Sequence, residues 1–452
     1  MKLLKTSLAL ALSSTLLMGC NDDSIDSEPV TDLTVSTFNL SFDRSSFDQL
    51  VDEMETSPAD QQILVDALLD GSIADSDKEK AEKVVQIRNV AAIIQKNRPN
   101  VLMMGEFNNN GTGTDTSALV GFQTNYLSVP QSLNSVDGGS MLEPITYPYF
   151  ESYATNTGLN SGLDLDNNGV LGEMPGDAWG FGLYHGQYAF ALMSQYPIDK
   201  DNTRTFQEFL WKDLPSSENP KITNCNDPEN TIPDNMACGD DWYTAAEWDQ
   251  VRLSSKNHID APIIVPTVNG NETIHLLMSH PTPPVYDTVT NHNKMKNRDE
   301  IQFWTDYIEG AEYIYDDSNV NGGLEDNAKF VIMGDLNADP ADGDGYTETI
   351  RALLNHQYVN GDATVGSLVP VSNGAAEEHA NRTYPEQVTS TFGLRVDHAI
   401  PSVNLEIESS GVFWPATGEQ GRLLVNDPRI GGGSGKSTSS DHRMVWTTIS
   451  FE

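Results

Sequence analysis

Apolar and polar positions along the chain follow two periods, one typical of strands and one of helices. Residues 33–38 alternate between the two kinds of side chain, which predicts a strand. A helical period runs from about residue 46 to 95 and breaks near Gly71. Pro99 ends this helical region. The short apolar run 101–104 then predicts a buried strand.

The rest of the chain contains more strands than helices. Further strands are predicted at residues 188–194, 263–268, 273–278, 329–333, 399–407 and 444–449. A helix is predicted over 297–313, and residues 108–163, rich in Gly, Asn, Ser and Thr, are predicted to form loops with a few strand pieces. Strands alternate with helices early and cluster late, which predicts an α/β or α+β fold. Because no linker divides the chain after residue 32, we expect one domain over 33–452.

The first 20 residues have the pattern of a processing signal. Lys2 and Lys5 precede an apolar stretch, residues 8–17, that is too short to span a bilayer. Leu17-Met18-Gly19-Cys20 resembles the lipobox of bacterial lipoproteins. That resemblance implies that Cys20 is lipidated and becomes the mature N-terminus; an ordinary signal peptide cut nearby is the alternative.

Residues 21–32 are acidic and polar, which predicts a flexible tether between the anchor and the domain. We therefore expect an exported protein that is anchored by lipid to a bacterial membrane, in the periplasm or at the cell surface. The anchor would be its one contact with the membrane. No protein partner is evident from the sequence.

The chain is strongly acidic. It has 66 Asp and Glu against 26 Lys and Arg among 452 residues, a formal net charge of -40. Such a field favours solubility, and it repels nucleic acid, anionic membranes and phosphate esters at long range. Any phosphate chemistry would therefore require bound cations or a locally basic pocket.

Two cysteines remain once Cys20 is assigned to the lipid. Cys225 and Cys238 lie in one polar insertion, residues 213–241. In an exported protein this arrangement predicts a disulfide, with two free thiols as the alternative. The pair lacks the number of ligands and the histidine neighbours that a zinc site needs.

Polar, metal-competent residues follow several of the apolar runs. They are Phe38-Asn39, Gly105-Glu106, Ser279-His280-Pro281, Gly334-Asp335-Leu336-Asn337, Arg395-Val396-Asp397-His398 and Ser440-Asp441-His442-Arg443. Each motif alone is weak. In this order they resemble the endonuclease/exonuclease/phosphatase superfamily over nearly the whole chain. The resemblance implies a four-layer α/β (α+β) sandwich, in which two packed mixed β-sheets are flanked by helices.

The resemblance also implies roles for these residues. Glu106 would be the main metal-binding carboxylate, supported by Asn39 and Asp441, and the ion would be Mg²⁺ or Mn²⁺. Asp335 would orient or deprotonate the attacking water, and Asn337 would bind phosphate. The remaining catalytic residues of the pattern are His442, paired with Asp397, and His280, which would stabilise developing charge; which histidine is acid or base stays open. Gly105 departs from the family, where glutamine often precedes the glutamate.

Two further clusters suggest binding sites. Residues 164–169 read Asp-Leu-Asp-Asn-Asn-Gly, with oxygen ligands at alternate positions and a glycine for the turn. The predicted Ca²⁺ ligands are Asp164, Asp166, Asn168 and Glu173; the alternative is a solvated turn. A basic patch of Arg252, Lys256 and His258 could bind phosphate, or could be a solvated loop. The glycine-rich segment 431–437 is interpreted as a flexible loop beside the site.

These observations predict an exported metal-dependent phosphoesterase that hydrolyses phosphodiesters or phosphomonoesters with water. Its substrate would be a small, lipid-like or nucleic-acid phosphate ester. One alternative is an extracellular nuclease, and another is a non-catalytic calcium- or ligand-binding surface lipoprotein of the same fold. A long basic groove would favour the nuclease, and a small basic pocket would favour a small substrate.

Overall fold

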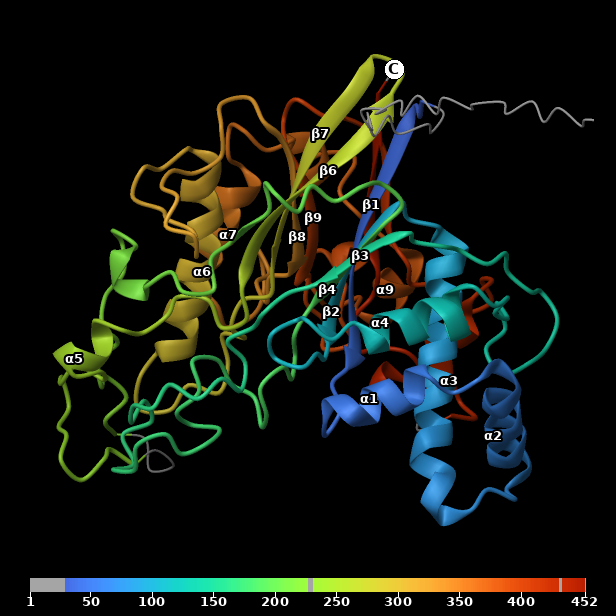
Figure 1. The fold of residues 1–452 in the computed structure, drawn as a ribbon, viewed down its shortest axis with the longest axis horizontal. Helices are drawn as coiled ribbons and strands as arrows, with labels where there is room; N and C mark the ends of the chain where they lie inside the picture. The colour runs from blue at the N-terminus through green and yellow to red at the C-terminus, as the bar shows by residue number, and fades with distance from the viewer. Residues whose placement is uncertain (1–28, 227–230, 431–432, 452) are drawn as a thin grey trace, which may run out of the picture.

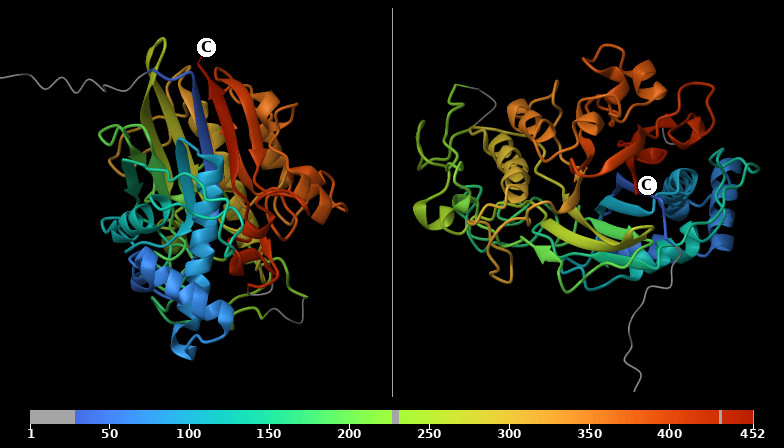
Figure 2. Two further views of the ribbon diagram at one scale, coloured as in Figure 1. Left: turned by 90° about the vertical axis from the view of Figure 1, so that its right-hand side faces the viewer. Right: turned by 90° about the horizontal axis from the view of Figure 1, so that it is seen from above.

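Two mixed β-sheets lie face to face at the centre of the molecule (Figures 1 and 2). The computed structural model describes residues 29–226, 231–430 and 433–451. The first sheet has the strand order β10 (Glu406–Val412), β13 (Val445–Ser450), β1 (Asp32–Phe42), β2 (Val101–Phe107), β4 (Ala191–Ser194) and β3 (Tyr149–Ser152). β1 and β2 are parallel, and the other neighbours in this sheet are antiparallel.

The second sheet is also mixed. Its order is β5 (Arg204–Thr205), β6 (His258–Thr267), β7 (Gly270–Ser279), β8 (Lys329–Asp335) and β9 (Asp397–Pro401), with β7 and β8 parallel. β11 (Asn426–Asp427) and β12 (Gly433–Ser434) form a separate short ladder. The inner faces of the two large sheets share one apolar core, in which Phe38 of β1 and Met333 of β8 are both buried.

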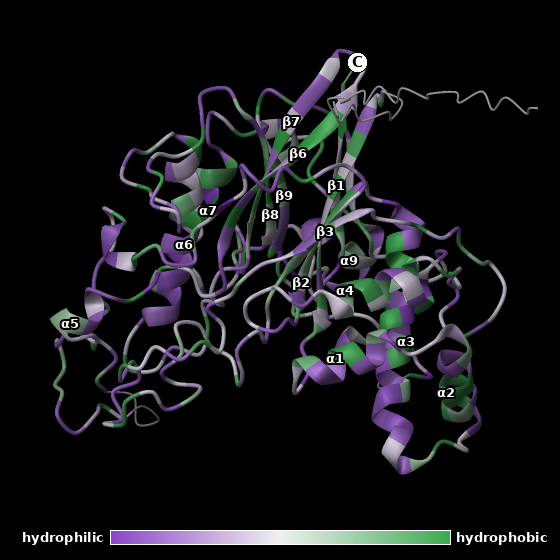
Figure 3. Cartoon of the chain, viewed as in Figure 1, coloured by the Kyte–Doolittle hydropathy of each residue, from purple (hydrophilic) through white to green (hydrophobic). Residues whose placement is uncertain are grey.

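Helices cover the outer faces of the sheets. On one side lie α1 (Phe47–Met54), α2 (Pro58–Asp70), α3 (Asp75–Asn97) and α4 (Ser117–Phe122); on the other lie α6 (His292–Ile308) and α7 (Thr347–Leu354) (Figure 1). Helix α3 carries both apolar and polar residues (Figure 3), and its apolar side packs on the first sheet. Trp304 of α6 packs in a second core with Ile332 of β8. The predicted four-layer α/β sandwich is confirmed.

Shorter helices and turns occupy the connections. They are α5 (Ala245–Trp248), α8 (Gly361–Thr364), α9 (Asn373–Glu378), a π-helical turn at Gln123–Leu127 and 3₁₀ turns at Trp211–Asp213, Pro385–Gln387, Arg422–Leu424 and Gly435–Ser437. The predicted disulfide between Cys225 and Cys238 is present in the insertion that precedes α5. No helix in the described part of the chain is long and apolar enough to cross a membrane.

Local sequence explains where the N-terminal helices begin and end. Pro58 stands in the first turn of α2, after Ser57, whose side chain accepts a hydrogen bond from the Asp60 amide. Gly71 ends α2 in a left-handed conformation with φ of 76°, which glycine adopts without steric cost. The predicted break near Gly71 is therefore correct.

Other predicted boundaries were wrong. Residues 399–407 do not form one strand, because the chain leaves β9 after Pro401 and enters the other sheet as β10. Proline cannot donate to a ladder, which suits a strand end. Residues 108–163 contain the predicted loops and a strand piece, β3, but also the helix α4, which was not predicted. Helix α6 spans His292–Ile308, so it starts and ends earlier than the predicted range 297–313. The signal region 1–20, with Cys20, and tether residues 21–28 lie outside the described residues.

A buried ionic network joins the helical layer to the end of β1. The Arg44 guanidinium donates to Glu53 at 2.6 Å and to Gln86 at 2.9 Å, and both charged side chains are 1% exposed. Gln86 of α3 in turn donates to the carbonyls of Ser41 and Ser439 at 3.0 and 2.8 Å. The network therefore ties β1, α1 and α3 to the segment before Ser440.

Glu53→Gln is expected to lower the free energy of unfolding by about 3–5 kcal/mol, because it leaves the Arg44 charge buried without its partner. Asp52→Asn is the matched control, since Asp52 pairs with Lys80 and its side chain is 68% exposed. Asp52→Asn should lower the free energy of unfolding by less than about 1 kcal/mol. Urea denaturation followed by circular dichroism measures both changes in unfolding free energy. Equal losses of stability in the two variants would contradict a special role for the buried Arg44–Glu53 pair.

Acid should destabilise the second core through His292. Its Nε2 lies 2.8 Å from the Tyr243 hydroxyl, and burial, aided by the Lys296 charge, lowers the pKa of His292 from 6.5 to about 3. Between these pH values the unfolded chain binds a proton that the folded chain does not bind. The contribution of His292 to stability is therefore expected to fall as pH drops below about 6.5.

His292→Gln should reduce this acid sensitivity, because glutamine does not titrate. The difference in unfolding free energy between pH 7 and pH 5 is expected to shrink by on the order of 1–2 kcal/mol. Urea titrations of wild type and variant at both pH values measure it. His356→Gln controls for the loss of a histidine, since the His356 Nε2 lies 2.9 Å from Glu309 Oε1 and contacts neither Tyr243 nor Lys296 in the described residues. Unchanged acid sensitivity in the His292 variant would refute the assignment.

Candidate active site

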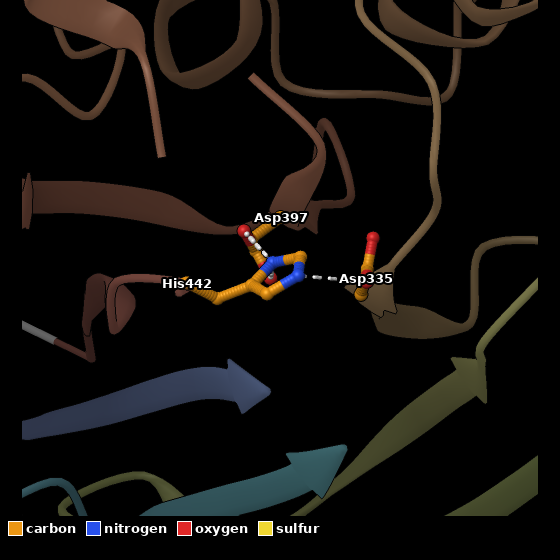
Figure 4. Close-up of side chains that lie close together, drawn as sticks. All are labelled: Asp335, Asp397 and His442. Carbon is orange, nitrogen blue, oxygen red and sulfur yellow. Dashed lines mark hydrogen bonds and ion pairs between the residues drawn. The ribbon is translucent and has the colours of Figure 1, made fainter. Parts of the chain in front are cut away.

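Three buried side chains at strand ends form the centre of the site (Figure 4). Asp335 ends β8, Asp397 begins β9, and the two residues are paired in the ladder. His442, from the segment before β13, donates from Nδ1 to Asp397 Oδ2 at 2.9 Å. Its Nε2 lies 3.6 Å from Asp335 Oδ2. The imidazole is therefore held between two carboxylates.

The two carboxylates decide the charge of this imidazole. Burial disfavours the imidazolium, but Asp397 and then Asp335 outweigh it and raise the pKa of His442 to about 10. Burial also raises the pKa of Asp335 to about 6, a rise that Asp397 supports and His442 opposes. At neutral pH His442 is consequently a cation beside an Asp335 carboxylate.

His280 approaches Asp335 from the end of β7. Its Nε2 lies 3.4 Å from Asp335 Oδ2, and its buried Nδ1 has no hydrogen-bond partner among the described residues. Burial, with the nearby Lys256 and His442 charges, holds the pKa of His280 well below its ordinary value. The two histidines of the site thus differ in charge, with His280 neutral and His442 positive.

Asn39 links the two sheets at the site. From β1 its Nδ2 donates to Asp335 Oδ2 at 3.1 Å and to Glu106 Oε1 at 3.3 Å. Asn39 is paired with Gly105 in the β1–β2 ladder, and a Cβ on Gly105 would lie 3.2 Å from the Asn39 Cα. That is tighter than ordinary packing, so glycine suits the position where the family often has glutamine.

Two of the three predicted metal ligands, Glu106 and Asp441, present carboxylate oxygens that suit a hard divalent ion. Glu106 has a left-handed φ of 51°, and its buried Oε2 lacks a hydrogen-bond partner within the described ranges. Asp441 is held by Ser41, whose hydroxyl donates to its Oδ1 at 2.5 Å, and its side chain is 25% exposed. Carboxylate and amide oxygens are the ligands that Mg²⁺ and Mn²⁺ prefer. The carboxylates of Glu106 and Asp441 therefore fit the predicted ion. Asn39 instead turns its Nδ2 toward Glu106 and Asp335, while its Oδ1 accepts a hydrogen bond from the Ser41 amide at 3.1 Å, so its predicted ligand role stays a prediction.

Sequence reasoning missed two charged residues at this place. The Lys436 ammonium lies 3.4 Å from Asp43 Oδ1, 3.5 Å from Glu106 Oε2 and 3.9 Å from Asp441 Oδ2. Lys436 lies within the glycine-rich segment 431–437, which is interpreted from the sequence only as a flexible loop beside the site. The signal for it is that this segment leads into the Ser-Asp-His motif, whereas no sequence pattern marks Asp43.

A cavity of about 690 Å³ extends from these residues. Its lining includes Glu106 and His280, together with Lys256, Lys296 and Lys436. Aromatic side chains also line it: Trp179, Phe181, Tyr188, Trp242, Tyr243 and Tyr286. The cavity therefore combines three lysines with the carboxylates of Glu106, Asp166 and Asp287 and with aromatic surface.

The predicted phosphate-binding patch is divided in the structure. Lys256 lines the cavity and its Nζ lies 3.5 Å from the Pro281 carbonyl. Arg252 instead donates to Asn156 at 2.8 Å and pairs with Glu208 at 3.0 Å. His258 is engaged on both ring nitrogens, by the Ser254 hydroxyl and the Glu300 carbonyl. Arg252 and His258 are thus not among the residues that line the cavity.

Asn337 supports the turn after β8. Its backbone amide donates to Asp335 Oδ1 at 2.9 Å, and its side-chain amide donates to the Pro281 carbonyl at 3.1 Å. Its φ of 51° is left-handed, a conformation that asparagine tolerates. These bonds fix Asp335 and the segment after His280, and the predicted phosphate contact of Asn337 stays a prediction.

The predicted calcium loop includes a residue that the sequence pattern missed. Oxygen atoms of Asp164, Asp166 and the buried Asp177 lie within 4.8 Å of one another. The Asn168 side-chain amide donates to Asp166 at 3.1 Å and to Glu173 at 3.0 Å. Asp177 stands beyond the expected loop and joins it only through folding, and Ca²⁺ binding here stays a prediction.

Similarity to known proteins is found in both sequence and structure. The model of the Endonuclease/Exonuclease/phosphatase family matches residues 36–442. An endonuclease/exonuclease/phosphatase from Beutenbergia cavernae is 13% identical over 93% of this chain and 72% of its own, with a TM-score of 0.41. A family protein from Leptotrichia buccalis is 12% identical over 93% of this chain and 100% of its own, with a TM-score of 0.40. A beta toxin from Staphylococcus aureus is 12% identical over 92% and 99%, with a TM-score of 0.39.

No curated protein matches this chain. The family match alone spans most of the sequence and includes all the motifs from Asn39 to His442. Members of this family are typically metal-dependent phosphoesterases or nucleases. The chain belongs to the endonuclease/exonuclease/phosphatase family.

Proposed function

We propose that this protein is a divalent-metal-dependent phosphoesterase that hydrolyses small phosphodiesters or phosphomonoesters by attack of water. The observation that carries the proposal is the buried Asp335–His442–Asp397 arrangement, which the Asn39 side-chain amide links to the Glu106 carboxylate. This arrangement supports roles for Asp335 as a carboxylate base and His442 as an imidazolium, next to metal-competent carboxylates.

The chain's own groups suit in-line displacement at phosphorus. The Asp335 carboxylate would hold and deprotonate the attacking water, while the His442 imidazolium, oriented by Asp397, would stabilise charge on the phosphoryl oxygens. Neutral His280 and the Lys256 ammonium would contact the same oxygens from the cavity wall. A divalent ion held by Asn39, Glu106 and Asp441 would supply neutralisation of the phosphate and assistance to the leaving oxygen.

The cavity supports a small substrate over nucleic acid. Its lysines, Lys256, Lys296 and Lys436, line one cavity of about 690 Å³, a size typical for small-molecule sites. A net charge of -40 opposes binding of a nucleic-acid backbone. The aromatic walls suit an ester whose alcohol part is apolar or aromatic.

We also propose that the protein is exported and anchored to a membrane by lipid. Residues 1–20 and Cys20 support export and lipid anchoring to a bacterial membrane, and residues 21–32 support a tether to one domain over 33–452. The Cys225–Cys238 disulfide is consistent with an oxidising compartment. Globomycin, which blocks lipoprotein signal cleavage, should cause the uncleaved precursor to accumulate if this assignment is correct.

Asp335→Asn and His442→Ala should each lower kcat by roughly 10²–10⁴-fold, because they remove the base and the charge-stabilising group. The full chain in detergent would be assayed with bis-p-nitrophenyl phosphate, p-nitrophenyl phosphate and plasmid DNA. His356→Ala, away from the cavity, is the control. Turnover that survives both variants would contradict the assigned roles, and preferential cleavage of DNA would favour the nuclease alternative.

Removal of divalent ions with EDTA should abolish turnover, and Mg²⁺ or Mn²⁺ should restore it. In Glu106→Gln, restoration should require at least about tenfold more ion, because one charged ligand is lost. Unfolding curves recorded with and without EDTA separate loss of activity from loss of fold. If the Glu106→Gln variant responds to the ion like wild type, the predicted ligand set is wrong. No turnover with any ion would favour the non-catalytic lipoprotein.

A further inference from the structure

Lys436 places a positive charge among three carboxylates at the candidate metal site. Its Nζ lies 3.4 Å from Asp43, 3.5 Å from Glu106 and 3.9 Å from Asp441. Two of these carboxylates belong to the ligand set proposed for the divalent ion. The ammonium therefore occupies the region in which that ion's charge would be needed.

The three distances show how the ammonium is held. Each exceeds the 2.7–2.9 Å that is usual for a charge-assisted N–H···O bond, so Nζ is shared among the carboxylates and tightly bound to none. Glu106 Oε2 correspondingly lacks a hydrogen-bond partner in the described part of the chain. The arrangement neutralises negative charge without the close coordination that a divalent ion provides.

The segment that carries Lys436 also differs from those that carry the ligands. Glu106 lies on β2, and Ser41 and Ser440 hold the end of β1 and Asp441 together by hydrogen bonds. Lys436 instead stands in the short 3₁₀ turn Gly435–Ser437, and its side chain is 46% exposed. The backbone next to Lys436 is loosely surrounded, because a Cβ added at Gly435 would have no atom within 4 Å. Lysine also has a long side chain with many accessible rotamers, so it can move while the ligands stay in place.

We infer that Lys436 is a resident counter-ion of the metal site, which competes with the divalent ion for Glu106 and Asp441 and leaves them when the ion binds. Without the ion, the ammonium limits repulsion among the three carboxylates. When the ion binds, the carboxylates turn to it and Lys436 is released toward the cavity that it lines. The released ammonium is then available to a substrate phosphate.

This inference rests on the metal site of the proposed function. Replacement of a metal ligand or of a structural residue would weaken ion binding. Removal of Lys436 should strengthen ion binding. Lys436→Met should lower the Kd for Mn²⁺ by at least about fivefold, because the ion no longer has to displace a unit positive charge from Glu106 and Asp441. Isothermal titration calorimetry on the metal-free full chain in detergent, without substrate, measures this affinity.

Matched variants separate the local effect from general charge. Lys436→Arg keeps the charge and should leave the affinity near that of wild type. Lys200→Met removes the charge of an exposed lysine that pairs with Glu151, away from the site, and should change little. A Lys436→Met affinity equal to or weaker than that of wild type would overturn the inference. So would an equal gain in Lys200→Met, since it would indicate only long-range charge.

Displacement of the ammonium can also be observed directly. Reductive methylation with formaldehyde and dimethylamine borane, read by peptide mass spectrometry, reports how freely each lysine amine reacts. Saturating Mn²⁺ should raise the methylation rate of Lys436 several-fold while that of Lys200 stays constant. An unchanged or slower rate for Lys436 would show that the amine is not released.

The two proposals fail in distinguishable ways. If Glu106→Gln binds Mn²⁺ as tightly as wild type, the metal site of the proposed function is misplaced. If Glu106→Gln loses affinity while Lys436→Met shows no gain, the metal site stands and the role of Lys436 is wrong.

Discussion

Compensation of buried negative charge is the constraint on which this structure depends. Asp335 and Asp397 are almost wholly buried and are paired directly opposite each other in the β8–β9 ladder. The chain as a whole already carries a net charge of -40. Two buried carboxylates so close together are costly unless a cation is shared between them. His442 provides that cation, which explains both its raised pKa and its fixed orientation. The same requirement recurs at Glu106 and Asp441, where Lys436 supplies the charge.

The face-to-face packing of the sheets brings these charges together. Asn39 and Glu106 come from the first sheet and Asp335 and Asp397 from the second, so the Asn39–Asp335 hydrogen bond crosses between the layers. Behind the site, the buried Arg44 network fixes the end of β1 against α1, α3 and the segment before Ser440. The chemistry thus depends on a scaffold that is itself held by buried polar groups.

The distribution of charge reconciles an acidic protein with a phosphate substrate. Acidic residues outnumber basic ones over the whole chain, but three lysines line the same cavity as Glu106 and His280. Attraction is therefore confined to a short range inside the cavity, whereas the outer field repels polyanions. An extended nucleic acid would meet that outer field along its length, whereas a small ester would meet the lysines inside the cavity.

The sequence by itself determined the elements and the order of the motifs. Alternating and helical periods placed most strands and the break at Gly71, because those periods are local properties of the chain. The order of motifs from Asn39 to His442 indicated the family, and the location of Cys225 and Cys238 in one polar insertion of an exported chain predicted their disulfide. Tertiary structure alone decided which side chains meet. Asp43 joins Lys436, Asp177 joins Asp164, and residues 399–407 divide between two sheets, because these contacts depend on how distant segments pack and not on any local pattern.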